Sequence, residues 1–236
     1  MKLASFDIET ASIVSDHDKN WSEQLNLGIS CAAIAFSDRD DIISWSGNPQ
    51  LTQEEARQVV QYLNELSSSG YSLVTWNGCA FDFRVLAEES GLVQKAAQLA
   101  MSHTDLMMIV TFTKGWFLGL DKALQGAGLS GKLHKVRLSD GTVLKEMDGA
   151  KAPLLWAKGE KEAVLNYLEQ DVRQLLDLTQ VVLQRSKIAW TSNSGRPQSI
   201  RLKKLYTVKE CFDLPEPDTS WMTNPPSRNQ FVKWMK

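Results

Sequence analysis

Two acidic residues, Asp7 and Glu9, lie two positions apart in the apolar run 3–10 near the N-terminus. The run predicts a buried strand, and because alternate side chains of a strand point to opposite faces, both carboxylates lie on one face. Carboxylates held side by side repel each other and lose hydration unless a cation or a shared proton compensates them. The pair therefore predicts a metal site, and a strand end with two solvated acids remains the alternative.

A third acidic position, Asp82, follows the predicted strand 72–76 and the turn Asn77-Gly78. It lies at the start of a predicted helix over 80–89, where the helix dipole favours a carboxylate that faces the strand ends. An ordinary helix-start acid is the alternative interpretation of this residue.

A fourth position lies in the strongest predicted helix, over 160–185, whose apolar residues repeat every three or four positions. Tyr167 and Asp171 are four residues apart in it, so they lie on the same face and border the apolar stripe. An aspartate beside a core face needs a compensating partner. We therefore expect this helix to pack on the sheet with Asp171 in contact with such a partner.

The elements that must position these residues alternate between strands and helices. Apolar runs at 29–36 and 41–45 predict a hairpin, and the residues 52–66 show helical spacing. Helix, strand and helix after a hairpin predict an α/β sheet of mixed direction. Further along, the pattern indicates a helix over 115–129 and a basic loop or hairpin over 132–148.

The character of the chain changes after residue 187. The segments 188–191 and 199–202 flank turn residues and predict a hairpin, and a Pro-rich extended tail follows. We expect residues 1–187 to form the main domain and residues 188–236 to form a hairpin and tail that pack on it. A tail rich in Pro and Trp is also a candidate for docking a protein partner.

The composition is that of a globular protein, with 236 residues, 43% hydrophobic and 23% charged. No apolar stretch reaches the length of a membrane span, and Met1-Lys2 leads into the acidic strand without a signal peptide. We expect a soluble, cytoplasmic protein without membrane contacts. The cysteines Cys31, Cys79 and Cys211 lack metal-ligand spacing and are interpreted as reduced thiols.

Charge is unevenly distributed along a chain whose net charge is -2. Residues 1–113 contain 6 Lys and Arg against 15 Asp and Glu, whereas residues 114–145 contain 6 against 2 and residues 195–236 contain 8 against 4. An acidic body with two basic segments is compatible with a cation site beside a surface that attracts phosphates. Solvated faces without a partner are the alternative.

In combination, the acidic positions resemble a known family. Their order matches the three motifs of the DEDD superfamily of 3'-5' exonucleases: Asp7-Ile8-Glu9, then Asn77 with Phe81-Asp82, then Tyr167 with Asp171. The histidine subclass would carry its His at position 166, which is Asn here, so Tyr167 fits the tyrosine subclass (DEDDy). That subclass includes ribonuclease D and the proofreading domains of family-B DNA polymerases. The chain looks closest to small stand-alone proteins related to the polymerase-B exonuclease domain, and its last fifty or so residues fall outside the resemblance.

The resemblance implies a fold and an activity. The fold is ribonuclease H-like: α/β, with a central mixed five-stranded sheet and flanking helices. The activity is metal-dependent 3'-5' exonuclease hydrolysis of single-stranded nucleic acid, with DNA favoured, that releases nucleoside 5'-monophosphates. The alternatives are an exoribonuclease, and a non-catalytic nucleic-acid-binding or interaction module on the same fold.

The resemblance also implies roles for individual residues. Hard carboxylate oxygens suit Mg²⁺ or Mn²⁺, and the two divalent cations would be held by Asp7, Glu9, Asp82 and Asp171. Tyr167 would orient the attacking water. We expect the 3' end of the strand to be bound by Thr10, Asn77, Phe81 and Lys132, with help from Lys135 and Arg137.

Several other residues have open or structural interpretations. Trp76 is a stacking surface or a core residue, and Asp105 is a supporting group or a helix cap. The three histidines, His17, His103 and His134, are interpreted as structural or surface residues.

Overall fold

The computed structural model describes residues 1–13, 26–132 and 135–236, so His17 and His134 lie outside the described residues. At its centre is a five-stranded mixed sheet in the order β3-β2-β1-β4-β5. β1 pairs antiparallel with β2 and parallel with β4. The strands are β1 (Lys2–Thr10), β2 (Ile29–Phe36), β3 (Ile42–Ser46), β4 (Tyr71–Thr75) and β5 (Thr104–Asp105). The predicted α/β class with five mixed strands is confirmed.

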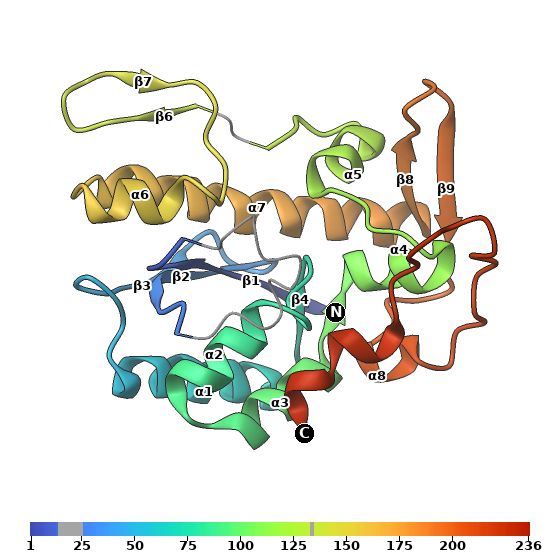
Figure 1. Ribbon diagram of the computed structural model, residues 1–236, viewed down its shortest axis with the longest axis horizontal. Helices are drawn as coiled ribbons and strands as arrows, with labels where there is room; N and C mark the ends of the chain where they lie inside the picture. The colour runs from blue at the N-terminus through green and yellow to red at the C-terminus, as the bar shows by residue number, and fades with distance from the viewer. Residues whose placement is uncertain (14–25, 133–134) are drawn as a thin grey trace.

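Helices cover both faces of this sheet (Figure 1). The long helix α7 (Lys161–Arg185) lies on one face, with its apolar stripe buried against β1 and β2. The opposite face is covered by α1 (Gln53–Ser68), α2 (Asp82–Ser90) and α3 (Val93–Ser102). Because both faces are covered, the central strands are apolar along most of their length, and every residue of β2 is buried.

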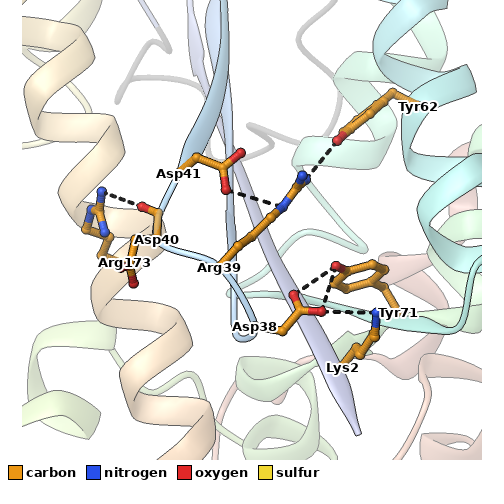
Figure 2. A network of polar contacts seen from close by, with 8 residues as sticks. All are labelled: Lys2, Asp38, Arg39, Asp40, Asp41, Tyr62, Tyr71 and Arg173. Carbon is orange, nitrogen blue, oxygen red and sulfur yellow. Dashed lines mark hydrogen bonds and ion pairs between the residues drawn. The ribbon is translucent and has the colours of Figure 1, made fainter.

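The turn between β2 and β3 is bonded to both helical layers (Figure 2). Arg39 donates to the Tyr62 hydroxyl of α1 at 3.1 Å, and Arg173 of α7 donates to the Asp40 carbonyl at 3.2 Å. Asp38 accepts a hydrogen bond from Tyr71 at 2.8 Å and pairs with Lys2. The β2–β3 turn is thus fixed by polar contacts to α1, α7, β1 and β4.

Between β5 and α7 the chain forms short elements beside α7. They are α4 (Leu106–Lys114), α5 (Leu120–Ala127), the hairpin of β6 (Val136–Arg137) and β7 (Val143–Leu144), and α6 (Ala152–Ala157). The predicted helix over 115–129 was wrong at its start. Gly115, with φ of 81°, ends α4 in a left-handed conformation, so the next helix begins only at Leu120.

After α7 the chain forms the predicted hairpin, from β8 (Lys187–Thr191) and β9 (Pro197–Arg201). It packs against α5, where Gly126 is required because a Cβ there would lie 2.1 Å from the Ala189 carbonyl oxygen.

The C-terminal tail is less extended than predicted. It contains α8 (Val208–Cys211) and the 3-10 turns η2 (Arg228–Phe231) and η3 (Lys233–Met235). The Arg228 guanidinium donates to four backbone carbonyls and lies over the Phe112 ring, so the tail packs on the rest of the chain. No helix in the described parts is both long and apolar enough to cross a membrane. The domain boundary near residue 187 stays a prediction.

Candidate active site

The central strand β1 places Asp7 and Glu9 in the middle of the molecule, between α7 and the start of α2. Glu9 is 7% exposed, and both Asp7 and Asp82 accept a hydrogen bond from the Ile8 amide, at 3.0 and 3.2 Å. The shared donor joins the first and second acidic positions.

The turn after β4 positions Asp82 at the first residue of α2. Asp105 organises this turn, because its two carboxylate oxygens accept from the amides of Asn77 and Cys79, each at 3.0 Å. Asp105 also accepts from the Met108 amide and thereby caps α4. It is therefore both a cap and a supporting group. Gly78 contacts the Thr75 side chain too closely for any Cβ, so this turn has one tight geometry.

The middle of α7 carries Tyr167 and Asp171, which are 1% and 2% exposed. The hydroxyl of Ser5 on β1 donates to the Val172 carbonyl at 2.6 Å and holds this part of the helix against the strand. We predicted a compensating partner for Asp171, and the structure places Lys132 there. Its Nζ lies 2.5 Å from Asp171 Oδ2 and 3.0 Å from the Tyr167 hydroxyl.

Mutual repulsion and burial raise the proton affinity of these acids. Burial, together with the charge of Asp171, raises the pKa of Asp7 to about 6. Burial and the charge of Asp7 hold the pKa values of Glu9 and Asp82 well above their usual range. Protonation, which the raised pKa values of these acids favour, and the ammonium of Lys132 on Asp171 therefore compensate part of the negative charge.

The donor set fits a hard divalent cation, since it consists of carboxylate oxygens that are costly to bring together without positive charge. The positions of these side chains, in contrast, do not form a metal site among the described residues. Within residues 1–13, 26–132 and 135–236, no three His, Cys, Asp or Glu side chains are grouped so that they could hold a metal ion. Lys132 supplies positive charge beside Asp171, the one acid of this set on α7.

Burial also affects Tyr167 and Lys132. Burial and the charge of Asp171 raise the pKa of Tyr167, so its hydroxyl stays protonated near neutral pH. For Lys132, burial lowers the pKa, but the charges of Asp171, Tyr167 and Asp7 and the hydrogen bond to Asp171 together outweigh burial, and the net pKa is raised. The site thus combines a neutral phenol and a charged ammonium with its acids.

The expected nucleotide contacts lie around these acids with different local bonding. Thr10 is buried and donates to the Ser12 carbonyl at 2.8 Å. Asn77 adopts a φ of 70°, and its buried side-chain oxygen accepts no hydrogen bond from the described residues. Phe81 and Trp76 are half-buried and pack against the core, which favours the core interpretation of Trp76. His103 is buried and hydrogen-bonded, as predicted for a structural residue.

The other expected phosphate contacts lie apart from the carboxylates. Lys135 and Arg137 line a basic cavity of about 470 Å³ on the outer side of α7, together with Arg173. Gln174 connects this cavity with the segment that carries Lys132. It lines the cavity and donates to the carbonyl of Gly131, the residue before Lys132.

Two contributions were missed from the sequence. Asp148 raises the pKa of Glu9, and Gly149 follows beside the Glu9 carboxylate, so the segment after β7 closes one side of the site. The Trp234 indole donates to the Cys79 carbonyl at 2.8 Å, inside the turn that leads to Asp82. Neither carried a local signal, because both act through chain segments distant in sequence.

Comparisons with known proteins agree with this architecture. The family model described as the RNase H superfamily matches residues 4–183. Among solved structures, the chain is similar to the family B DNA polymerase from the hyperthermophilic archaeon Pyrobaculum calidifontis, with a TM-score of 0.56 and 18% identity. The match covers 78% of this chain and 24% of the polymerase chain, so this chain spans about a quarter of that protein. At this identity the likeness shows a shared fold. No curated protein sequence matches significantly.

Proposed function

Because the chain belongs to the RNase H superfamily, we propose that it is a metal-dependent 3'-5' exonuclease of the tyrosine subclass. It hydrolyses the terminal phosphodiester bond of single-stranded nucleic acid, with DNA favoured, and releases nucleoside 5'-monophosphates. Its membership of this superfamily and its polymerase-like fold suggest a nucleic-acid hydrolase, and the polarity and substrate are the finer part of the proposal.

The observation that carries the proposal is the convergence of Asp7, Asp82 and Asp171 from three separate elements. They come from the central strand, a helix start and the long helix; Asp171 raises the proton affinity of Asp7, and Asp7 raises that of Asp82. Burying repelling acids is costly, and such strained groups are concentrated at functional sites. Tyr167 joins them through Lys132, which contacts both Tyr167 and Asp171.

Each side chain then has a role in the reaction. Asp7, Glu9, Asp82 and Asp171 would hold two divalent cations, Mg²⁺ or Mn²⁺, which when bound activate water and stabilise charge on the phosphate. Tyr167, kept neutral by burial, orients the attacking water through its hydroxyl.

The nucleotide contacts complete the proposal. Lys132 turns from Asp171 to the scissile phosphate, because a phosphate and a carboxylate both accept from an ammonium group. Asn77 offers an unsatisfied acceptor to the terminal nucleotide, Phe81 offers a ring beside it, and Thr10 contacts the terminal sugar. We further propose that residues 1–187 form the catalytic unit and that residues 188–236 support it.

The test is digestion of 5'-labelled single-stranded DNA and RNA of one sequence with Mg²⁺, Mn²⁺ or EDTA. Wild type is expected to give a ladder that shortens from the 3' end, faster on DNA. EDTA and Asp7→Asn should both abolish it, while the surface variant Asp41→Ala should retain it. A protein that yields no metal-dependent ladder on either strand would contradict the proposal and favour a binding module; a faster ladder on RNA would favour the exoribonuclease.

A further inference from the structure

Four aromatic rings from separate parts of the chain line one cavity of about 690 Å³, here called the aromatic cavity. Trp116 and Phe117 lie between α4 and α5, Trp190 lies on β8, and Trp221 lies in the C-terminal tail. The cavity lies on the side of the molecule where α5 and the β8–β9 hairpin meet (Figure 1). Its volume is within the range of roughly 300–1,000 Å³ that is typical of ligand sites.

The rings of the aromatic cavity combine exposure with fixed positions. Phe117 is 48% exposed and Trp221 is 69% exposed, although both are large apolar side chains. Behind them, Trp116 and Trp190 pack edge to face with centroids 5.5 Å apart, and Phe117 packs on Phe231 at 6.0 Å. Apolar side chains gathered in this way on a surface indicate contact with another molecule.

Charge around the cavity favours a polyanion. Lys114 and Lys122 line it, and Lys122 is held at its rim by donating to Asn193 at 2.7 Å. The one acid among the described lining residues is Asp121, whose oxygens accept from the Lys132 amide and from Gln125. The segments 114–145 and 195–236, which build most of the cavity, are the two basic segments of the chain. Exposed rings beside lysines are the combination that binds single-stranded nucleic acid.

The aromatic cavity is linked to the carboxylate site by contacts of two residues, Asp121 and Lys132. Asp121 lines the cavity and accepts from the backbone amide of Lys132 at 2.9 Å. The side chain of the same lysine ends on Asp171, 2.5 Å from its carboxylate oxygen. One lysine thus contacts a cavity-lining residue through its backbone and Asp171 through its ammonium, so a short strand can reach both regions.

We propose that the aromatic cavity stacks bases of the single strand on the 5' side of the bond that is cut, an inference that rests on the proposed function. Lys114 and Lys122 attract the phosphates between these bases. Every base has a flat face, so this contact selects single strands without selecting a sequence.

The test compares the double variant F117A/W221A with wild type on a dinucleotide and on a dodecanucleotide of DNA. For binding, the wild-type cavity and F117A/W221A are compared in the Asp7→Asn background, by fluorescence anisotropy without metal. For kcat/KM, the two are compared with Asp7 intact. We expect dodecanucleotide binding to weaken by about tenfold or more, the size expected for lost base stacking. The loss of kcat/KM should be larger for the dodecanucleotide than for the dinucleotide.

Two further variants separate stacking from folding. Trp221→Phe keeps a ring and should bind nearly as wild type, whereas Trp221→Leu should bind more weakly than Trp221→Phe but not as weakly as F117A/W221A, which also lacks the Phe117 ring. Leu154→Ala removes an exposed apolar side chain outside the cavity. It should change neither dodecanucleotide binding nor kcat/KM on either substrate.

The possible failures are distinguishable. Wild-type hydrolysis together with unchanged dodecanucleotide binding by F117A/W221A would overturn the inference alone. Equal losses on both substrates would also overturn it, because they indicate a structural defect. If F117A/W221A instead turned a wild-type dimer into a monomer without affecting binding, the cavity would be an interface between two copies. Ring-dependent binding by a wild type that hydrolyses nothing would overturn the proposed function and leave the inference standing.

Discussion

The indole N–H of Trp234 donates a hydrogen bond to the carbonyl oxygen of Cys79 at 2.8 Å. Cys79 lies in the turn between Asn77 and Asp82, and its Sγ contacts the Phe231 carbonyl at 3.5 Å. The last turns of the chain therefore contact the turn that precedes Asp82. Through these contacts the tail supports the turn that positions Asp82.

This contact predicts an effect of Trp234→Phe on both stability and turnover. The substitution keeps an aromatic ring and removes the donor, so the free energy of unfolding should fall by about 1–3 kcal/mol. Because the turn positions Asp82, kcat should fall by about tenfold, as small misplacements of reacting groups have large effects on rate. Urea denaturation and steady-state kinetics check the two effects. Trp45→Phe on β3 is the matched control, and equal behaviour of both variants would contradict a positioning role for Trp234.

Lys132 predicts a link between the free energy of unfolding and divalent cations. Lys132→Met leaves the buried Asp171 without its ammonium partner, and we expect a loss of about 2 kcal/mol in the metal-free protein. This is below the usual cost of breaking a buried pair, because Lys132 is 25% exposed. Added Mg²⁺ or Mn²⁺ should stabilise Lys132→Met more than wild type, since the lysine no longer competes for Asp171.

The control for this prediction is Lys135→Met, which removes an exposed lysine outside the carboxylate group. In a double-mutant cycle, Asp171→Asn should remove most of the cost of Lys132→Met. Equal stabilisation of wild type and Lys132→Met by the cation would mean that Lys132 and the cation do not share Asp171.

Tyr167→Phe is expected to lower kcat and leave KM nearly unchanged. The phenol stays protonated, so it contributes an oriented hydroxyl and removes no proton itself. Loss of orientation alone should lower kcat by about 10–100-fold, less than the loss of a full acid–base catalyst. Tyr206→Phe, in the C-terminal region, controls for loss of a hydroxyl. A variant whose KM rises while kcat is retained would place Tyr167 in binding instead.

The parts of the fold that could be predicted are those with a local periodic signal. β1, α1 and α7 have long apolar patterns, and the acids in or beside them could be placed on a face by spacing alone. β5 has two residues and could not be distinguished from a loop, and α5 starts late because Gly115 ends the preceding helix. Short elements depend on tertiary contacts that a local pattern does not contain.

In the candidate site, too, the residues placed by one element could be predicted and those placed by tertiary contacts could not. Asp7 and Glu9 shared a predicted face, and Asp82 was placed at a helix start, because both follow from the geometry of one element. The Lys132 contact with Asp171 spans 39 positions and the Trp234 contact with Cys79 spans 155. Such contacts are set by how elements pack, so the sequence predicted the acids and the supporting role of Asp105 but neither the pairing of Lys132 with Asp171 nor the contact of Trp234 with Cys79.

Buried His103 predicts a loss of stability in mild acid. Its Nδ1 lies 2.7 Å from the Ala100 carbonyl, which can only accept, so Nδ1 carries the proton and Nε2 accepts from the Thr75 hydroxyl at 2.8 Å. Thr75 in turn accepts from Gly78 in the turn before Asp82. Burial lowers the pKa of His103 from 6.5 to about 4, so the neutral form is required for this chain of hydrogen bonds.

The sign of the pH effect follows from proton binding in the two states. Between pH 6.5 and about 4 the unfolded chain binds a proton at this histidine and the folded protein does not. The contribution of His103 to stability is therefore full above pH 6.5 and should fall by about 1.4 kcal/mol per pH unit on acidification, down to about pH 4. The raised pKa values of Asp7, Glu9 and Asp82 act in the opposite direction in metal-free protein, so only a difference measurement isolates His103. Urea denaturation of wild type and His103→Gln across this range should give a shallower decline for the variant, and parallel curves would show that His103 does not control acid stability.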